Sequence, residues 1–406
     1  MRLAIFATHP IQYQVPLFRA LARRPGVDLE VLFGHDHGLR PTFDRGFGRA
    51  VQYDVPLLDG YAHRFMTNRA PRPGVTITGL LNPEIARAVA SGRYDALVLH
   101  GYAPLTCQLA LFTPRRRARV LLRGDSNAVL RRAALKAAVK HVALRAVFAR
   151  VDQFLVSGAR NRRYYERYGV EGDRMTLAPF SVDNAYFAER SRAARADPAA
   201  ARLRLGLPVD RPLFVFAGKL IHEKRLHDAI RAIAAANAGR SRGTGAPPAG
   251  AAPGAKVALA IVGDGELGDA LRAEVARERV EDDVFFLGFR NQSELPEVYG
   301  AADAFVLPSG FEQWGLAVNE AMACGLAPIV SDRVGAAADL VANGEGAVFT
   351  VGDVRGLADI FVDLARRPER LAAMKLAAAA RIRSWGIEET ADGFIAGVER
   401  ALARRA

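Results

Sequence analysis

The first half of the chain alternates short apolar runs with amphipathic segments. Amphipathic stretches such as QVPLFRALARR and ARNRRYYERYG predict helices. Runs rich in Val, Leu, Ile and Phe predict strands over residues 2–8, 27–33, 94–100, 118–124 and 153–158. Apolar strands that alternate with helices are typical of a parallel sheet covered on both faces.

The second half repeats this pattern. A strand is predicted at 174–179, and the polar, Ala-rich passage after it indicates a linker near 184–200. Further strands are predicted at 213–219, 257–263, 283–289, 304–309 and 327–332. We therefore predict an α/β protein of two Rossmann-like domains that face each other across a cleft.

The predicted domains span residues 1–185 and 186–383. Residues 384–406 predict a helix that is broken at Gly386 and could cross back onto the first domain. The segment 240–255 is rich in Gly, Pro and Ala without periodicity, so it predicts a mobile surface loop.

Length and composition agree with this division. A chain of 406 residues exceeds the usual size of a single core, and half of its residues are hydrophobic. The two cysteines lie far apart without a metal-binding or disulfide pattern, which favours a reducing, cytoplasmic location. The N-terminal apolar run is too short for a signal peptide, and no run approaches about 18 apolar residues, so a membrane span is not expected.

A net charge of +13 favours anionic partners. The densest basic segment, residues 128–150, contains no acid. It is either an ordinary solvated helix or a contact with the surface of a membrane, which would place the protein peripherally at the inner face. A basic nucleic-acid-binding protein would explain the charge but not the acidic motif described below, and no nucleic-acid partner is expected.

Polar residues at the predicted strand ends identify candidate sites, because ligands of open α/β sheets bind at the carboxyl ends of the strands. In the first half these residues are His9, His100 and Asp125. In the second half they are Lys219, Asp264, Ser309 and Glu312.

The first-half candidates each allow two interpretations. Asp125 is a base or polar anchor, or the N-cap of a helix beginning near Ser126. His100 orients an acceptor hydroxyl or satisfies a loop carbonyl. His9 and Gln12 are further polar candidates at the end of the first predicted strand. The sequence HDH at 35–37 has too few further ligands to predict a metal site.

The turn GDGELG at 263–268 follows a strand and precedes a helix, as a dinucleotide site requires. A nicotinamide site also needs an acid after the next strand, whereas Asp282 and Asp283 precede it. The alternative is a glycine-lined turn, with Gly263, Asp264 and Gly265, that approaches another nucleotide.

Lys219 and Lys224 lie on one short segment between a strand and a helix. Two ammonium groups near a helix N-terminus provide a binding site for a diphosphate. Two solvated lysines are the alternative.

The segment FEQWGLAVNEAMACG at 311–325 places Glu312 and Glu320 eight positions apart. With the lysine segment and the following PIVSD, it resembles the retaining glycosyltransferases of family GT4, which have the GT-B fold. The resemblance is strongest from about 213 to 340. Lys219 and Lys224 match the basic pair of the family's G-R-L-x-x-x-K segment, with Lys219 where Arg is usual and Arg225 where Gly is usual.

The resemblance assigns roles on the donor side. It implies that Glu312 contacts sugar hydroxyls and that Glu320 binds the ribose of the nucleotide. The alternative is that Glu312 compensates the dipole of the following helix and that Glu320 is a solvated residue on it. The main-chain N–H groups of Gly315, Leu316 and Ala317 would lie near the sugar and phosphates. Phe289 and the 263–265 turn complete the expected donor side.

The first half departs from the family in two places. THPIQYQVPLFR stands where many members have a Gly-Gly pair, and RGDS stands where a catalytic His is common. The resemblance therefore carries the catalytic role to Asp125. The catalytic candidates are Asp125, His100, Glu312 and Lys224, and the resemblance makes His9 and Gln12 the candidates for the acceptor or sugar side.

The expected function is transfer of a sugar, with retention, from a nucleotide diphosphate sugar to a hydroxyl of a glycolipid or surface polysaccharide. No cofactor is expected. The chain has no D-x-D motif, so a metal-independent reaction is expected. The alternative is a nicotinamide-dependent oxidoreductase that uses the 263–268 turn.

Overall fold

The structure is a computed structural model that describes residues 1–127, 134–238 and 256–404, with only the backbone given at 134–139. The predicted loop at 240–255 lies outside the described residues. The described chain divides into two compact units. The first unit comprises residues 1–42, 55–182 and 385–406, and the second comprises 43–54 and 183–384.

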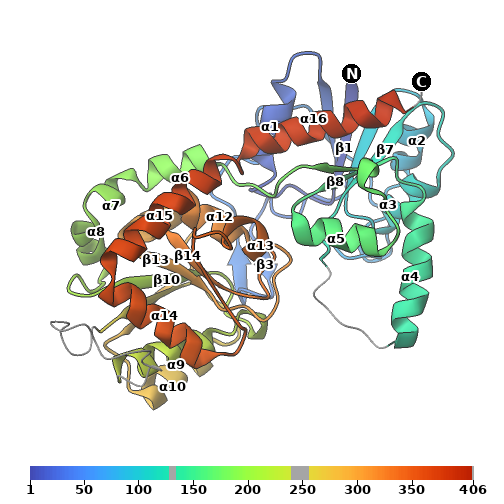
Figure 1. Cartoon of the computed structure of the whole chain (residues 1–406). Coiled ribbons are helices and arrows are strands. Elements are labelled where there is room, and N and C mark those ends of the chain that lie inside the picture. Colours follow the sequence, from blue (N-terminus) through green and yellow to red (C-terminus); the bar gives the residue numbers. More distant parts are fainter. Residues whose placement is uncertain (128–133, 239–255, 405–406) are drawn as a thin grey trace. The chain divides into compact units, whose positions relative to one another are not determined.

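The first unit is built on a parallel sheet with the strand order β5-β2-β1-β6-β7-β8-β9. Its strands are β1 (Arg2–Ala7), β2 (Asp28–Phe33), β5 (His63–Phe65), β6 (Ala96–His100), β7 (Arg119–Arg123), β8 (Gln153–Val156) and β9 (Met175–Leu177). Its helices include α1 (Val15–Ala22), α2 (Glu84–Ala90), α3 (Leu105–Phe112), α4 (Ala134–Phe148) and α5 (Ala159–Arg167). The strands predicted in the first half are confirmed (Figure 1).

The second unit has a parallel sheet with the order β12-β11-β10-β13-β14-β15. Its strands are β10 (Leu213–Ala217), β11 (Ala258–Val262), β12 (Val284–Gly288), β13 (Ala304–Leu307), β14 (Ala327–Ser331) and β15 (Ala347–Phe349). Its helices include α9 (Leu226–Asn237), α10 (Gly268–Glu278), α11 (Leu295–Ala301), α12 (Leu316–Ala323), α13 (Ala337–Leu340), α14 (Val354–Arg366) and α15 (Pro368–Arg383). Two parallel sheets with helices confirm the predicted fold class.

The passage predicted as a linker is helical. It forms α6 (Asn184–Arg190), α7 (Arg192–Ala196) and α8 (Pro198–Leu205). The Asp183 and Asp197 side chains accept hydrogen bonds from the main-chain N–H groups of Tyr186 and Ala200, at 3.0 and 2.9 Å, and so cap two of these helices. Small alanines of this passage pack against α11. This close packing takes the place of the large apolar face that would have indicated helices in the sequence.

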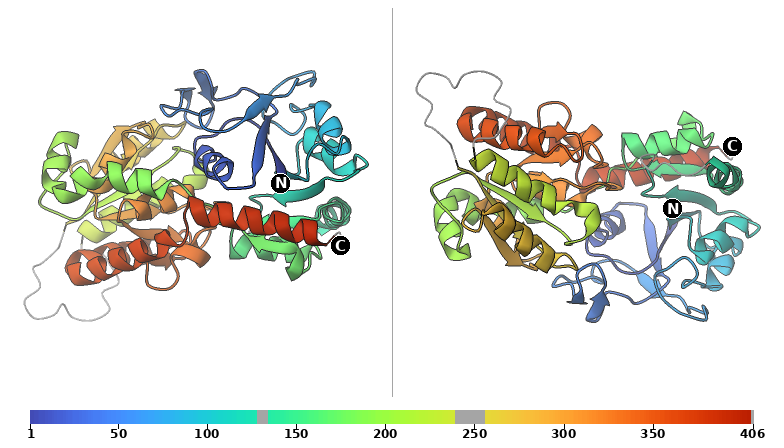
Figure 2. Two further views of the ribbon diagram at one scale, coloured as in Figure 1. Left: turned by 90° about the horizontal axis from the view of Figure 1, so that it is seen from above. Right: turned by 90° about the horizontal axis from the view of Figure 1, so that it is seen from below.

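The last helix, α16 (Ile387–Ala403), belongs to the first unit, where it contacts α1, β7, β8 and β9. Figures 1 and 2 show it, in red, lying along that unit. A Cβ atom at Gly393 would lie 2.2 Å from the Leu177 carbonyl oxygen, and one at Gly397 would lie 2.4 Å from Leu155. Glycine at these two positions therefore lets the helix approach the strands closely.

The segment 43–54 is a second difference from the predicted boundaries. This segment contains most of β3 (Thr42–Asp44) and all of β4 (Arg49–Val51), and these two strands pair with each other. The segment belongs to the second unit. The first predicted domain, residues 1–185, therefore includes a segment that packs with the other unit.

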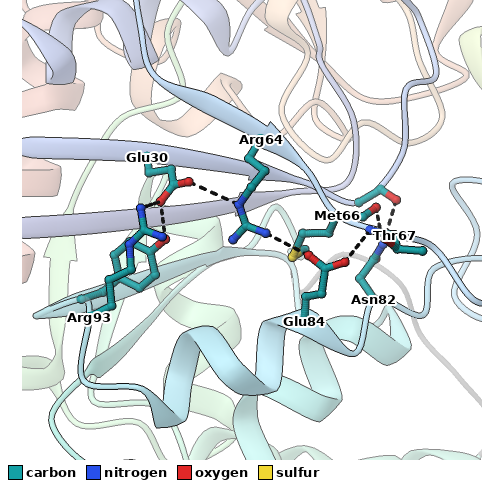
Figure 3. A network of polar contacts seen from close by, with 9 residues as sticks. Glu30, Arg64, Met66, Thr67, Asn82, Glu84 and Arg93 are labelled. Atoms are coloured by element: carbon teal, nitrogen blue, oxygen red, sulfur yellow. Dashed lines mark hydrogen bonds and ion pairs between the residues drawn. The ribbon is translucent and has the colours of Figure 1, made fainter.

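A polar network fixes β5 at the edge of the first unit's sheet (Figure 3). Arg64 donates to Glu30 at 3.3 Å and to Glu84 at 2.9 Å, and Glu84 also accepts from the N–H of Thr67. Asn82 is fully buried and donates to the carbonyl oxygens of Gly34 and Met66, at 3.0 and 3.2 Å. These bonds join β2, β5 and α2.

Replacement of Asn82 tests this network. In Asn82→Ala the two carbonyls and the Thr106 hydroxyl, which donates to Asn82 at 2.8 Å, lose their buried partner. We expect the free energy of opening of β1, β2 and β6, measured by native-state hydrogen exchange, to fall by about 2 to 3 kcal/mol. The exposed Asn343, replaced by Ala, should change stability by less than about 0.5 kcal/mol. Equal effects would contradict the assigned role.

Candidate functional site

Lys224 and Glu312 meet between two loops of the second unit. Lys224 lies in a 3₁₀ turn (His222–Lys224) after β10, and Glu312 lies between β13 and α12. Their side chains form an ion pair in which they are 19 % and 14 % exposed. The Ser309 hydroxyl donates to the same Glu312 carboxylate at 3.1 Å. The structure thus brings together two residues predicted separately from the lysine segment and the acidic motif.

Main-chain contacts hold these loops in place. The N–H of Gly310 donates to the Glu223 carbonyl at 2.7 Å, which joins the two loops directly. The N–H of Glu312 donates to the Arg333 carbonyl at 3.2 Å. Gly315 has φ +96°, and a Cβ atom there would lie 3.1 Å from Val334. The glycine before α12 is therefore explained by backbone conformation and close packing.

Glu320 lies on α12, one turn after its start, and is partly buried. Burial raises the pKa of Glu320 to about 7, and the Tyr299 hydroxyl, which donates to its carboxylate at 3.1 Å, opposes the shift. Gly315 is the N-cap, and Leu316 and Ala317 begin the helix. The N–H groups of a first helical turn have no intrahelical partner and attract anions.

The remaining donor-side candidates lie beside the 43–54 segment. Lys219 pairs with Asp44 at 2.9 Å, and Asp264 pairs with Arg49 at 3.0 Å. The Phe289 ring lies 5.1 Å from the ring of Phe47. These three predicted residues thus lie just after the carboxyl ends of β10, β11 and β12, which are neighbours in the sheet.

The glycine turn at 263–268 is explained by packing. Gly263 has φ +134°, and a Cβ atom there would lie 1.8 Å from the carbonyl oxygen of Gly218. A Cβ atom at Gly265 would lie 2.5 Å from the Leu220 carbonyl oxygen. Asp283, before β12, accepts from Arg211 at 2.6 Å and is bound at the amino end of its strand. It is therefore at the wrong end of the strand for a nicotinamide ribose.

The first unit contains a pocket of about 230 Å³ that includes His100 and Asp125 in its lining. His100 is deeply set, and burial followed by the nearby Arg123 charge lowers its pKa to about 3. Its Nε2 atom is buried without a hydrogen-bond partner among the described residues. His100 is therefore neutral near pH 7 and has a nitrogen available for a ligand.

Arg123 is a buried pocket residue that the sequence reasoning missed. Its guanidinium donates to the carbonyl oxygens of Ala178 and Pro179, at 2.7 and 3.0 Å, and lies over the ring of Phe180. Burial lowers the pKa of Arg123 to about 10. A charged residue at the end of an apolar run could have indicated it, whereas Thr390, also in the lining, comes from a distant segment without a motif.

Asp125 lies in the pocket lining but remains exposed. Desolvation by the surrounding protein raises the pKa of Asp125, and a hydrogen bond from its own backbone and the Arg123 charge oppose this shift. Ser126 and Asn127 are not helical, so the N-cap interpretation fails there.

His9 and Gln12 do not line this pocket, although their neighbours Thr8, Tyr13 and Gln14 do. The Thr8 hydroxyl lies 2.9 Å from His9 Nδ1. Burial, and then the charges of His37 and His35, lower the pKa of His9 to about 4. Within the described residues, no cluster of three or more His, Cys, Asp or Glu side chains could hold a metal ion.

Comparisons with known proteins match a large part of the second unit. Residues 199–381 match the family described as glycosyl transferases group 1. The chain is 34 % identical over 249 residues to D-inositol 3-phosphate glycosyltransferase of Stackebrandtia nassauensis, covering 59 % of this chain and 52 % of that protein. It is 32 % identical over 174 residues to 2-deoxystreptamine N-acetyl-D-glucosaminyltransferase of Streptomyces fradiae, covering 42 % and 38 %. The chain spans about half the length, or less, of these two relatives.

Solved structures match over nearly the whole chain. Anabaena Alr3699/HepE in complex with UDP has a TM-score of 0.69 at 17 % identity and covers 98 % of this chain and 100 % of its own. Sucrose-phosphate synthase from Thermosynechococcus elongatus has a TM-score of 0.69 at 18 % identity and covers 100 % of both chains.

Two Rossmann-like units of this kind define the GT-B fold. Residues 199–381 match the glycosyl transferases group 1 family, so the predicted resemblance to glycosyltransferases is confirmed for this part of the chain. The alternative of a nicotinamide-dependent oxidoreductase finds no support in these relatives. In the described ranges, no helix is both long and apolar enough to cross a bilayer.

Two glycines of the 263–268 turn provide a matched test of its structural role. In Gly263→Ala the added Cβ atom meets the Gly218 carbonyl, so we expect the free energy of opening of β10 and β11 to fall by more than about 2 kcal/mol. In Gly268→Ala nothing lies within 4 Å of the added atom, and we expect a change of less than about 1 kcal/mol. Hydrogen exchange of both strands measures this. Similar values for the two variants would contradict the packing explanation.

Proposed function

We propose that the protein is a retaining, metal-independent glycosyltransferase that moves a sugar from a nucleotide diphosphate sugar to a hydroxyl. The observation that carries the proposal is the meeting of Lys224 and Glu312 at the strand ends of a group 1 glycosyltransferase domain, with Glu320 on the adjoining helix. In this proposal Lys224 supplies a cation, Glu312 binds the sugar and Glu320 binds the ribose, all near the start of α12.

The donor half of the reaction requires stabilisation of the leaving diphosphate. Negative charge builds up on it as the anomeric carbon takes on oxocarbenium character. Lys224, Lys219 and the first N–H groups of α12 supply positive charge without a metal. Fixed groups of this kind can each contribute about 3 to 4 kcal/mol. Glu312 is assigned to the sugar hydroxyls, and its ion pair with Lys224 orients the carboxylate.

The acceptor is assigned to the pocket of the first unit. The neutral His100 accepts a hydrogen bond from an acceptor hydroxyl or donates one to it. Asp125, which is exposed in the lining of the same pocket, accepts the proton of this hydroxyl or holds the hydroxyl in place. Two curated relatives are named for inositol 3-phosphate and 2-deoxystreptamine, which bear several polar groups. We assign a hydroxyl of a glycolipid or surface polysaccharide to this chain, with the protein cytoplasmic and peripheral at the membrane.

A donor screen tests the proposal. UDP-, GDP- and ADP-sugars are titrated against the protein in excess EDTA, and binding and slow hydrolysis are followed. UDP-glucose is included because a structural neighbour has been solved with it. We expect one nucleotide to bind without metal, and Lys224→Ala and Glu320→Ala each to weaken binding by about a hundredfold.

Lys256→Ala is the matched control, because Lys256 is an exposed lysine of the same unit. It should leave binding unchanged. Binding of NAD or NADP in place of every nucleotide sugar, or binding that requires a divalent metal, would contradict the proposal.

The raised pKa of Glu320 predicts a pH dependence of donor binding. Ribose hydroxyls donate to the ionised carboxylate, so affinity is present above the folded pKa of about 7 and is lost as the pH falls through it. Between pH 8 and pH 6 the ionised fraction falls about tenfold, and the dissociation constant of a nucleotide sugar should rise by the same factor. Glu320→Gln should bind more weakly with no such slope. A slope that persists in this variant would assign the titration to another group.

A further inference from the structure

The segment 43–54 surrounds one of the candidate donor lysines. Both carboxylate oxygens of Asp44 lie 2.9 Å from Lys219 Nζ, and the Phe47 ring lies 5.0 Å from the same ammonium. A Cβ atom at Gly46 would lie 2.5 Å from Lys219 Cδ. The hairpin therefore approaches the lysine closely, and glycine at position 46 makes this possible.

The later residues of the hairpin make further contacts with the second unit. Arg49 pairs with Asp264, and Asn291 donates to the Gln52 carbonyl at 2.8 Å. Asp54 accepts from the N–H of Ser293 at 3.1 Å. Together with the Phe47 and Phe289 rings, these contacts spread over the edge of the sheet that carries the predicted donor residues.

The Asp44 carboxylate accepts from the Lys219 ammonium with both oxygens, as a bound anion would. The N–H groups of Gly46 and Phe47 donate to its Oδ1 atom, at 2.8 and 3.1 Å, and orient the carboxylate. Burial alone would raise the pKa of Asp44, but the hydrogen bond and charge of Lys219, together with the two backbone N–H groups, lower it. The carboxylate is thus a fixed counter-ion with two oxygens directed at the ammonium.

A diphosphate at Lys219 would compete with this carboxylate. The two anions need the same donor hydrogens, and they repel each other at close range. We propose that residues 43–54 form a cap on the donor site, in which the Asp44 carboxylate is the internal counter-ion of Lys219. The donor diphosphate takes the place of this carboxylate and displaces the cap. This inference rests on the proposed function and adds a residue that limits donor affinity.

A double-mutant cycle tests the cap. The dissociation constant of the nucleoside diphosphate found in the donor screen is measured by calorimetry at constant ionic strength for the full chain, Asp44→Asn, Lys219→Ala and the double variant. We expect Asp44→Asn to tighten binding by about three- to tenfold, because both partners are partly exposed. In the Lys219→Ala background the same substitution should have no effect.

Asp54→Asn is the matched control. It removes the same charge from the same hairpin, and the Asn amide oxygen can still accept from Ser293, which Asp54 contacts in place of Lys219. It should leave affinity unchanged. Equal tightening by both variants would assign the effect to net charge or to a loosened hairpin and would overturn the proposal, as would weaker or unchanged binding by Asp44→Asn.

Hydrogen exchange of residues 43–54 gives a second readout that does not depend on a variant. The diphosphate should increase exchange there as the cap is displaced, whereas increased protection would show that the hairpin closes over the ligand and would overturn the displacement. Absence of nucleotide binding by the unmodified protein would instead reject the proposed function itself.

Discussion

The ion pair between Lys224 and Glu312 is the interaction on which the candidate donor site depends. A partly buried pair is favourable when its other polar atoms are also satisfied, and the Ser309 hydroxyl donates to the Glu312 carboxylate. The Gly310 N–H, which donates to the Glu223 carbonyl, also joins the two loops. The loops after β10 and β13 are therefore held together before any ligand binds. Under our proposal a nucleotide sugar meets charges that are already positioned, which lowers the cost of reorganisation during transfer.

The pocket of the first unit is organised around a buried charge instead of an ion pair. Its pocket contains a buried arginine, Arg123, whose charge is satisfied by main-chain carbonyls and aromatic rings. That charge and burial keep His100 neutral. The helix α16 supplies Thr390 to the same pocket, where it accepts or donates a hydrogen bond with Ser181 at 2.6 Å. The last helix of the chain thus completes a site formed mainly by early segments.

The sheets, and the positions of Lys224, Glu312 and Glu320 after their strands, could be predicted because they depend on local patterns. Strands buried on both faces are apolar throughout, and each motif lies just after one of them. The helices at 184–205 were missed because alanines and aspartate caps replace an apolar face. The Asp44 contact was missed because it joins residues 175 positions apart. Arg225, noted where Gly is usual, has φ +50°, a conformation that favours glycine.

The central claim is that the loops around Lys224 and Glu312 bind the nucleotide diphosphate. Hydrogen–deuterium exchange with and without the diphosphate, read by peptide mass spectrometry, tests it most directly. The account predicts slower exchange over residues 218–226 and at the start of α12, Gly315–Ala317, with little change at the Glu30–Arg64 network of the first unit. Protection confined to the first unit, or none in the presence of bound nucleotide, would contradict it.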